Sequence, residues 1–267
     1  MALPASSPLS TCVVTGASAG IGAELARVLA ARGHGVTLVA RREDRLRELA
    51  RELTQAYDVR VEAIACDVGD PQQRRHLANE LGERGLAVEV LVNNAGFGSA
   101  GRFQSLDPER EAEMVRLNVE AVVALCGSYA PAMVDRGRGA ILNVASTAAF
   151  QPGPGMAVYF ATKAYVLSFS EALHEEVKKH GVIVSALCPG PTATEFGEVA
   201  GFKPAGPSAK MLVSMAADSA SVVRAGLEGL ERNQAVVVPG LANKATAQAH
   251  RFFPRSWVRR IAGTIKL

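Results

Sequence analysis

The sequence predicts an α/β fold, a single doubly wound domain whose parallel sheet has about seven strands and carries helices on both faces. Three observations predict it. Short runs rich in Val, Ile and Leu alternate with amphipathic segments along most of the 267 residues. These runs are apolar throughout, as strands covered on both faces are. No linker or internal repeat separates the units, which favours one domain.

Each apolar run predicts one strand. The first lies in STCVVTG, and the later ones are expected in GVTLVA, VRVEAIACDV, VEVLVNNAG, GAILNVAS, VIVSALCPG and a short final QAVVVPG. Helices are expected between them, because Leu and Ile recur there at helical spacing. The predicted helices cover residues 21–33, 42–57, 71–85, about 107–134, and 157–181. Asp70 and Pro71 suit the N-cap and first position of the third helix.

Two segments stand apart from this alternation. From Pro191 to about Ala217 the sequence is rich in Gly, Pro, Thr and Ser, which predicts a loop over a site at about 190–217, within a domain of residues 1–240. The second segment, 241–267, contains six Lys and Arg and no Asp or Glu. The net charge of +3 therefore comes from this tail, and a nucleic-acid partner has little support.

The tail has three readings. Its Phe252, Phe253 and Trp257 beside several arginines favour packing on the domain or a subunit contact. Association with a membrane surface is a less favoured alternative, and a disordered or lid-like segment is the third.

Cysteine usage and the N-terminus bear on the compartment. Four widely spaced cysteines form no CxxC pair and no Cys/His cluster, so we expect reduced core thiols and no metal site. The N-terminal segment lacks a positive region followed by a long apolar stretch, and no run of 18 uncharged apolar residues exists. These features predict a cytoplasmic protein without a transmembrane helix.

A glycine-rich turn, TGASAGIG, links the first strand to its helix. Gly16, Gly20 and Gly22 would let the backbone approach a ligand, and the helix N-terminus would present free N–H groups to a pyrophosphate, as in Rossmann-type domains. The spacing GxxxGxG differs from the common GxGxxG fingerprint. The alternative is that these glycines only permit tight packing.

The end of the second strand indicates which nucleotide would bind. A carboxylate there would hydrogen-bond a ribose 2′-OH and repel a 2′-phosphate. This chain has Ala40 at that point, followed by Arg41 and Arg42, which suit a phosphate dianion. NADP(H) is therefore favoured over NAD(H). The alternative is that both arginines simply begin a solvated helix.

Tyr159 and Lys163 lie one helical turn apart, so their side chains share a face. A phenol that transfers protons at neutral pH needs its pKa lowered, and the ammonium of Lys163 would favour phenolate. Ser146, at the end of the fifth strand, could hydrogen-bond the same substrate oxygen. Taken alone, Tyr159 and Lys163 read as a core tyrosine and a snorkelling lysine, and Asn118 as a solvent-facing residue in mid-helix.

In order and context, TGASAGIG, NNAG, Asn118, Ser146, YFATK and PG resemble the short-chain dehydrogenases/reductases of ordinary length, from Thr15 to about Pro239. The resemblance implies an NADP-dependent enzyme (EC 1.1.1.-) that transfers a hydride between the nicotinamide and a carbonyl or secondary alcohol. Tyr159 would be its acid/base, Lys163 would lower the tyrosine pKa and hold the nicotinamide ribose, and Asn118 would complete a proton relay. The predicted catalytic residues are Ser146, Tyr159, Lys163 and Asn118.

The cofactor site that we predict is larger. It consists of Gly16, Ser18, Gly20, Ile21, Gly22, Arg41, Arg42, Asp67, Val68, Asn94, Ala95, Gly96, Tyr159, Lys163, Pro189, Gly190, Thr192 and Thr194. In the family the position of Asp67 contacts adenine, although a turn role is equally compatible. Thr192 and Thr194 would contact the carboxamide. Asn93 is expected to tie the strand end to neighbouring backbone.

The substrate is less well defined. The segment TAAFQPGPGM and the loop residues Phe196, Phe202 and Met211 predict a neutral or lipophilic carbonyl or alcohol, although they would equally suit packing of the loop. The chain looks like the oxoacyl and hydroxysteroid reductase-like part of the family. A catalytically silent NADP(H)-binding regulator is the alternative function, and a lyase or epimerase would need a larger substrate domain. The helices from Asp107 and Ala157 would form a homodimer or homotetramer, as the resemblance implies.

Overall fold

A computed structural model describes residues 3–202, 216–249 and 254–263. Its sheet has seven strands in the order β3-β2-β1-β4-β5-β6-β7, and every neighbouring pair is parallel. The fold class predicted from the sequence is confirmed. The strands are β1 (Ser10–Thr15), β2 (Val36–Ala40), β3 (Val61–Ala65), β4 (Ala87–Asn93), β5 (Gly139–Val144), β6 (Val182–Leu187) and β7 (Val236–Val237).

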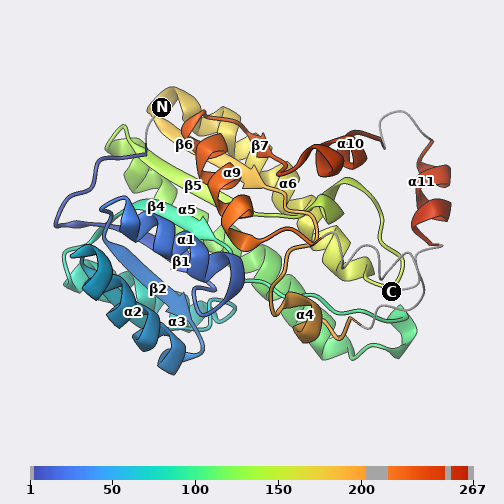
Figure 1. Cartoon of the computed structure of the whole chain (residues 1–267), viewed down its shortest axis with the longest axis horizontal. Helices are drawn as coiled ribbons and strands as arrows, with labels where there is room; N and C mark the ends of the chain where they lie inside the picture. Colours follow the sequence, from blue (N-terminus) through green and yellow to red (C-terminus); the bar gives the residue numbers. More distant parts are fainter. Residues whose placement is uncertain (1–2, 203–215, 250–253, 264–267) are drawn as a thin grey trace.

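Helices cover both faces of the sheet (Figure 1). One layer contains α1 (Gly20–Ala31), α2 (Glu43–Tyr57) and α9 (Ser219–Glu231); the other contains α3 (Pro71–Glu83), α5 (Ala121–Asp135) and α6 (Ala157–Val177). Each layer buries its own apolar cluster against the strands, with Leu25 and Leu46 in the first and Leu77 and Met133 in the second. Short 3-10 turns occur at η1 (Phe103–Ser105), η3 (Thr147–Phe150) and η4 (Lys178–His180).

The helix predicted at about 107–134 has the expected extent but not a uniform geometry. It begins as α4 (Pro108–Val115), widens into a π-helical turn, η2 (Arg116–Glu120), and continues as α5. In the described part of the chain, Pro108–Asp135 is the one helix long and apolar enough to cross a membrane by length and composition alone. It packs here against β4, β5 and α6. Because π-helical turns widen the helix locally and often occur at functional sites, Asn118 at its centre is of interest.

The loop and the tail predicted from the sequence are partly described. The loop contains the short helix α7 (Phe196–Val199), and Thr192 pairs with Ala217 in an isolated bridge. Met211, which we expected to face the substrate, lies outside the described residues, as do Phe252 and Phe253.

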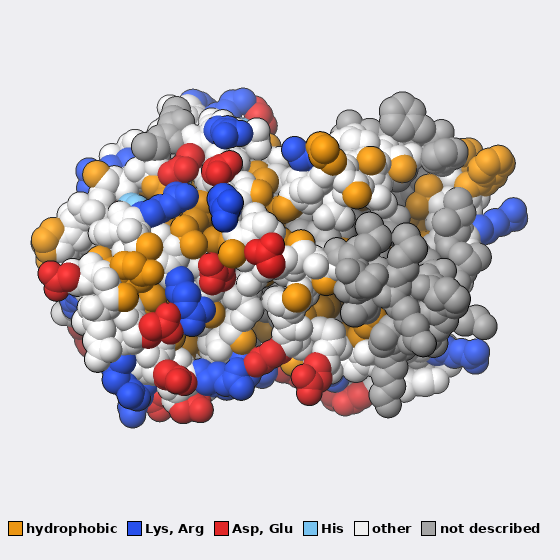
Figure 2. All heavy atoms as spheres, viewed as in Figure 1, with side chains coloured by type: hydrophobic (Ala, Val, Ile, Leu, Met, Phe, Trp, Pro, Cys, Tyr) orange, Lys and Arg blue, Asp and Glu red, His pale blue; other side chains and the backbone are white. Residues whose placement is uncertain are grey.

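The tail forms helices α10 (Leu241–Ala249) and α11 (Arg255–Ala262) (Figure 1). Helix α10 contacts η3. The charged side chains over the face shown in Figure 2 are of both signs and intermixed.

Candidate active site

The predicted site residues follow the carboxyl ends of the strands, where the sheet order reverses between β1 and β4. Ligands of doubly wound sheets bind in the crevice at this point. A cavity of about 1470 Å³ opens there, and it is lined by the glycine turn, Arg41, Arg42, Ser146, Tyr159 and Lys163 together with the other predicted cofactor residues. Gly22 and Asn118 are the two predicted site residues that do not line it.

The glycine turn serves packing and access at once. A Cβ on Gly22 would lie 2.3 Å from the carbonyl oxygen of Gly16, so the packing reading is correct for this residue. Gly16 and Gly20 have φ of +66° and +56°, a region that side chains disfavour. The α1 N-cap, Ala19, offers no side-chain bond to the first turn of the helix, which has no acidic residue. Its N–H groups are therefore suited to an anion.

Thr15, which sequence reasoning did not single out, holds the turn against the end of β4. Its hydroxyl donates to the carbonyl of Val92 at 3.2 Å and accepts from the backbone N–H groups of Asn94 and Ala95, both at 3.0 Å. The Asn94 amide in turn donates to the carbonyl of Thr15 at 2.9 Å. This network fixes the two strand ends that flank the crevice. In the sequence, the one feature that could have indicated this role of Thr15 is its place at the end of an apolar strand.

Arg42 lies directly over the glycine turn. Its Nε and Nη2 donate to the Ser18 hydroxyl at 3.2 and 3.0 Å. Arg41 is more exposed, and its guanidinium lies 3.8 Å from a carboxylate oxygen of Asp67 and 3.4 Å from one of Glu113. Both arginines line the cavity, although both side chains are exposed, so their role in cofactor choice stays a prediction.

Asp67 has the turn role considered for it, and its contact with adenine stays a prediction. One carboxylate oxygen accepts from the backbone N–H of Gly69 at 2.9 Å, as in a turn, and the residue also lines the cavity beside Val68.

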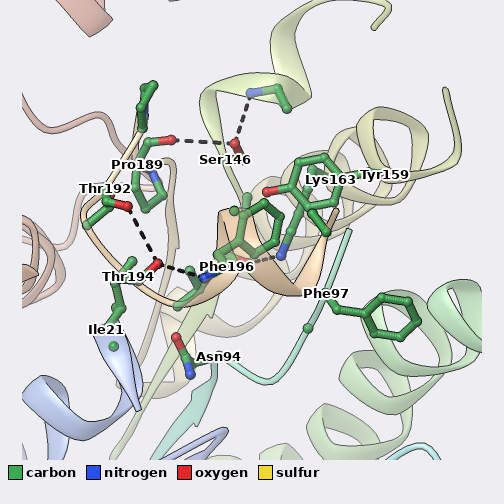
Figure 3. Close-up of a pocket in the computed structure, with 18 of the residues that line it drawn as sticks. Ile21, Asn94, Phe97, Ser146, Tyr159, Lys163, Pro189, Thr192, Thr194 and Phe196 are labelled. Carbon is green, nitrogen blue, oxygen red and sulfur yellow. Dashed lines mark hydrogen bonds between the residues drawn. The ribbon is translucent and has the colours of Figure 1, made fainter. Parts of the chain in front are cut away.

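Ser146, Tyr159 and Lys163 meet at the other end of the cavity (Figure 3). Ser146 caps η3 by accepting from the Ala148 N–H at 3.1 Å, and its hydroxyl donates to the Pro189 carbonyl at 3.5 Å. Lys163 Nζ donates to the Val144 carbonyl at 2.7 Å and lies 5.8 Å from the centre of the Tyr159 ring. Lys163 of α6 is thereby anchored to the end of β5, and Ser146 links the segment after β5 to the segment after β6.

Burial dominates the protonation of this pair. It raises the pKa of Tyr159 to about 12, while a hydrogen bond with Ser146 acts in the opposite direction. Burial also lowers the pKa of Lys163 to about 8. The expected lowering of the tyrosine pKa by Lys163 is not seen: burial raises the pKa of Tyr159, Ser146 is the group that lowers it, and the Lys163 ammonium bonds the Val144 carbonyl instead.

Asn118 is buried, with 1% of its surface exposed, so the solvent-facing alternative is wrong. Its Oδ1 accepts from the Phe97 N–H at 3.1 Å, and its Nδ2 donates to the Phe97 carbonyl at 2.9 Å and to the Thr162 hydroxyl at 3.1 Å. Its Oδ1 also lies against Gly96, where an added Cβ would approach it to 2.9 Å. The π-helical turn therefore fastens the loop after β4 to α6.

Asn93 is structural, as predicted, but its partner is a side chain and not the neighbouring backbone. Its amide donates to Asn143 Oδ1 at 2.8 Å, and Asn143 donates to the Ser170 hydroxyl at 2.9 Å. The chain of bonds links β4, β5 and α6.

The wall facing Ser146 and Tyr159 is largely apolar. Phe196 of the loop lies with its ring centre 5.1 Å from that of Tyr159. Phe150, Met156, Phe160 and Phe202 also line the cavity, as expected for the substrate-facing segments.

The tail contributes to the same wall, in keeping with the predicted packing on the domain, although the sequence did not indicate which of its residues face the cavity. Leu241, Thr246 and Ala262 line the cavity. Asn243 lies so close to Gly190 that a Cβ there would be 2.5 Å from its Oδ1. Residues on both sides of the boundary expected at residue 240 therefore line the same cavity.

The 192–196 loop closes over the crevice. Thr192 donates to the Gly190 carbonyl at 3.0 Å, and Thr194 accepts from the Phe196 N–H at 3.3 Å. Thr194 also contacts the glycine turn, since a Cβ on Gly20 would lie 3.0 Å from its methyl group. Both threonines line the cavity.

Comparison with known proteins agrees with this arrangement. The short chain dehydrogenase family model matches residues 10–201, and the chain belongs to the short-chain dehydrogenase/reductase family of oxidoreductases. Among curated proteins it is similar to a very-long-chain 3-oxoacyl-CoA reductase from Anas platyrhynchos, with 35% identity over 193 residues, 70% of this chain and 61% of the relative. The chain thus spans about three fifths of the length of such relatives.

Solved structures match nearly the whole chain. A short-chain dehydrogenase from Sphingobium yanoikuyae in complex with NADPH has a TM-score of 0.81 and 34% identity, and 96% of each chain is covered. A bulky-bulky ketone specific alcohol dehydrogenase from Comamonas testosteroni has a TM-score of 0.76 and 31% identity, with 92% of this chain and 94% of the other covered. Within the described residues, no group of three or more His, Cys, Asp or Glu could hold a metal ion.

Proposed function

We propose that this protein is an NADP(H)-dependent oxidoreductase that interconverts a lipophilic carbonyl compound and its secondary alcohol. The observation that carries the proposal is the placement of Ser146, Tyr159 and Lys163 in one cavity with the glycine turn and the Arg41–Arg42 pair. The complete set of hydroxyl, phenol and ammonium groups supports an enzyme over the alternative, a catalytically silent NADP(H)-binding regulator.

The residues present fit the cofactor. The positive φ of Gly16 and the bare N-terminus of α1 suit a pyrophosphate, while Arg42 and Ser18 form a donor pair at the place where a 2′-phosphate would follow β2. Ile21, Val68, Ala95 and Gly96 would border the bound molecule, and Pro189, Gly190, Thr192 and Thr194 would close over it. When bound, NADPH supplies the hydride.

The protein's own task is to handle the proton. In reduction the substrate oxygen becomes an alkoxide, and the buried Tyr159, whose pKa is about 12, carries the proton that it needs. Ser146 bonds the phenol and would hold the carbonyl oxygen beside it. Lys163, anchored on Val144, would hold the nicotinamide ribose, and in its charged form it would favour the phenolate. Oxidation runs the same proton transfer in reverse.

The apolar wall supports a substrate with a large apolar substituent. Phe150, Phe160 and Phe196 line the cavity, and few charged groups face it there. The similar proteins include one named for very-long-chain 3-oxoacyl-CoA and one named for bulky ketones. We accordingly place the substrate among ketones and 3-oxoacyl compounds with long or bulky apolar groups.

The experiment is a carbonyl panel. Consumption of NADPH and of NADH is followed with long-chain 3-oxoacyl thioesters, bulky ketones, and small charged ketones at equal concentration. Reduction of the apolar compounds with NADPH is expected. A preference for small charged ketones would reject the substrate class, and a protein that binds NADPH without consuming it on any compound would support the silent alternative.

Thr246 offers a sharper test of the wall, because it lies on α10 and lines the cavity. Thr246→Trp should lower kcat/KM for long or bulky substrates by about tenfold more than for small ones, since an added indole fills space there. Lys244→Trp places the same side chain on the same helix at a position that does not line the cavity, and it should leave the ratio unchanged. An equal effect of Thr246→Trp on all substrates would remove α10 from the substrate wall.

We also propose a cytoplasmic homodimer or homotetramer. The four buried free cysteines support a reducing compartment. Val115 on α4, Val123 on α5 and Tyr165 on α6 are exposed apolar side chains on the helices expected to form the subunit contact. Light scattering of Tyr165→Glu against the unmodified protein tests the assembly, because a charge in the contact would shift the mass toward that of the monomer.

A further inference from the structure

The carboxylate of Glu195 bridges two arginines at the start of α2. It accepts from Arg42 Nη1 at 2.9 Å and from Arg45 Nη1 at 2.6 Å. The hydrogen bond from Arg45 and, to a lesser extent, the one from Arg42 hold the pKa of Glu195 below its usual range. This side chain is therefore an anion at neutral pH. The three side chains are 41–46% exposed, which leaves them accessible to a ligand.

This ion pair joins two parts of the molecule that are far apart in sequence. Arg42 also donates to Ser18 of the glycine turn, so the guanidinium is shared between the cofactor crevice and the loop. Glu195 directly follows Thr194, which contacts Gly20, and directly precedes Phe196, which packs on Tyr159. The loop is therefore fastened over the crevice by an anion bound to the guanidinium that the 2′-phosphate would need.

We propose that Glu195 is an internal competitor of the 2′-phosphate for Arg42 and Arg45. An adenosine that carries a 2′-phosphate displaces the carboxylate from this pair, and displacement releases the 193–202 loop from α2. Glu195 and Arg45 are then specificity-determining residues that couple the identity of the cofactor to the loop that carries Phe196. The inference rests on the proposed use of NADP(H).

The charges of the two anions explain why a 2′-phosphate can replace the Glu195 carboxylate. A carboxylate carries one negative charge. A phosphomonoester carries about 1.5 to 2 negative charges near neutral pH and offers three acceptor oxygens. The existing pair is solvent-exposed, and exposed pairs contribute little each. A dianion should therefore displace the carboxylate from the same guanidinium groups, but with an affinity that the carboxylate measurably lowers.

The first experiment measures this loss of affinity with cofactor fragments that lack nicotinamide. Binding of adenosine 2′,5′-bisphosphate and of 5′-ADP to the full chain is measured by calorimetry for the unmodified protein and for Glu195→Gln. We expect the bisphosphate to bind Glu195→Gln about three- to tenfold tighter, with a much smaller change for 5′-ADP. An unchanged or lowered ratio of the two affinities would overturn the proposal.

Glu43→Gln is the matched control. Glu43 is adjacent to Arg42 in sequence but pairs with Arg47 at 2.6 Å. This variant removes the same charge from the same surface without touching the Arg42–Arg45 pair. Its affinity ratio should equal that of the unmodified protein; a ratio raised as much as in Glu195→Gln would reduce the effect to general electrostatics and overturn the role of Glu195.

The second experiment follows the loop itself. Hydrogen exchange is measured on α7 and its flanks, where the Val199 and Ala200 N–H groups bond the carbonyls of Glu195 and Phe196. The bisphosphate should raise exchange in residues 193–202 of the unmodified protein, and 5′-ADP should not. In Glu195→Gln the exchange should be high before any ligand is added. Exchange that stays unchanged with bound bisphosphate would overturn the coupling.

The binding results distinguish an error in the NADP(H) assignment from an error in the role of Glu195. If NADPH and the bisphosphate bind neither protein, the cofactor assignment is wrong and the competition falls with it. If both bind the unmodified protein and Glu195→Gln equally well, NADP(H) dependence stands and Glu195 is a surface ion pair only.

Discussion

Asn118 and Thr162 are joined by a hydrogen bond of 3.1 Å that connects the π-helical turn η2 to helix α6. Thr162 lies between Tyr159 and Lys163, and its own hydroxyl donates to the Tyr159 carbonyl at 2.7 Å. Through the Phe97 bonds, the same asparagine also fixes the loop after β4. One buried amide therefore sets the position of α6 relative to the crevice.

Replacing Asn118 by Ala should destabilise the protein. The Phe97 N–H and carbonyl would lose their partners in a buried site, at about 1–3 kcal/mol for each group left unpaired. Urea unfolding should show a lower midpoint with the slope retained. Asn79→Ala on the exposed side of α3 is the control and should change stability by less than about 0.5 kcal/mol. Equal stability of the two variants would contradict the structural role of Asn118.

The pKa values predict opposite pH profiles for the two directions. Lys163, with its pKa lowered to about 8, loses its charge as the pH rises through that value, while Tyr159, with its pKa raised to about 12, keeps its proton. Reduction needs protonated Tyr159 and charged Lys163, so its kcat/KM should be highest below about pH 8 and fall above it. Oxidation needs the phenolate, so its rate should rise with pH. Reduction that accelerates between about pH 7 and 9 would contradict these assignments.

Arg42→Ala should separate the two nicotinamide cofactors. Loss of a charge-assisted contact to a 2′-phosphate should raise the KM for NADPH about tenfold to a hundredfold, and that for NADH only slightly. Arg47→Ala, which removes an exposed arginine of α2 that pairs with Glu43, serves as the comparison. If Arg42→Ala raised both KM values equally, Arg42 would not distinguish the cofactors.

The sequence predicted those features that local pattern determines. Continuous apolar runs identify strands covered on both faces, and the residues that follow each strand share one edge of a parallel sheet. Gly16, Arg42 and Ser146 could be assigned to that edge for this reason. The four-residue spacing likewise placed Tyr159 and Lys163 on one face of α6.

Other features depend on contacts between distant segments and left no local signal. The approach of Asn243 to Gly190, and the pairing of Glu195 with Arg42, join residues whose neighbours in sequence give no hint of the contact. The protonation of Tyr159 was misjudged for a related reason. The spacing suggested that Lys163 would lower the pKa of Tyr159, whereas the effect of burial, which raises it, required the packed structure.

Tyr159→Phe tests the central claim most directly, because it removes one hydroxyl and keeps the ring that packs on Phe196. With a ketone that the unmodified protein reduces, kcat should fall by about 10²–10⁴-fold, while the Kd for NADPH stays within about twofold. Unchanged turnover with retained NADPH binding would show that Tyr159 is not the proton donor.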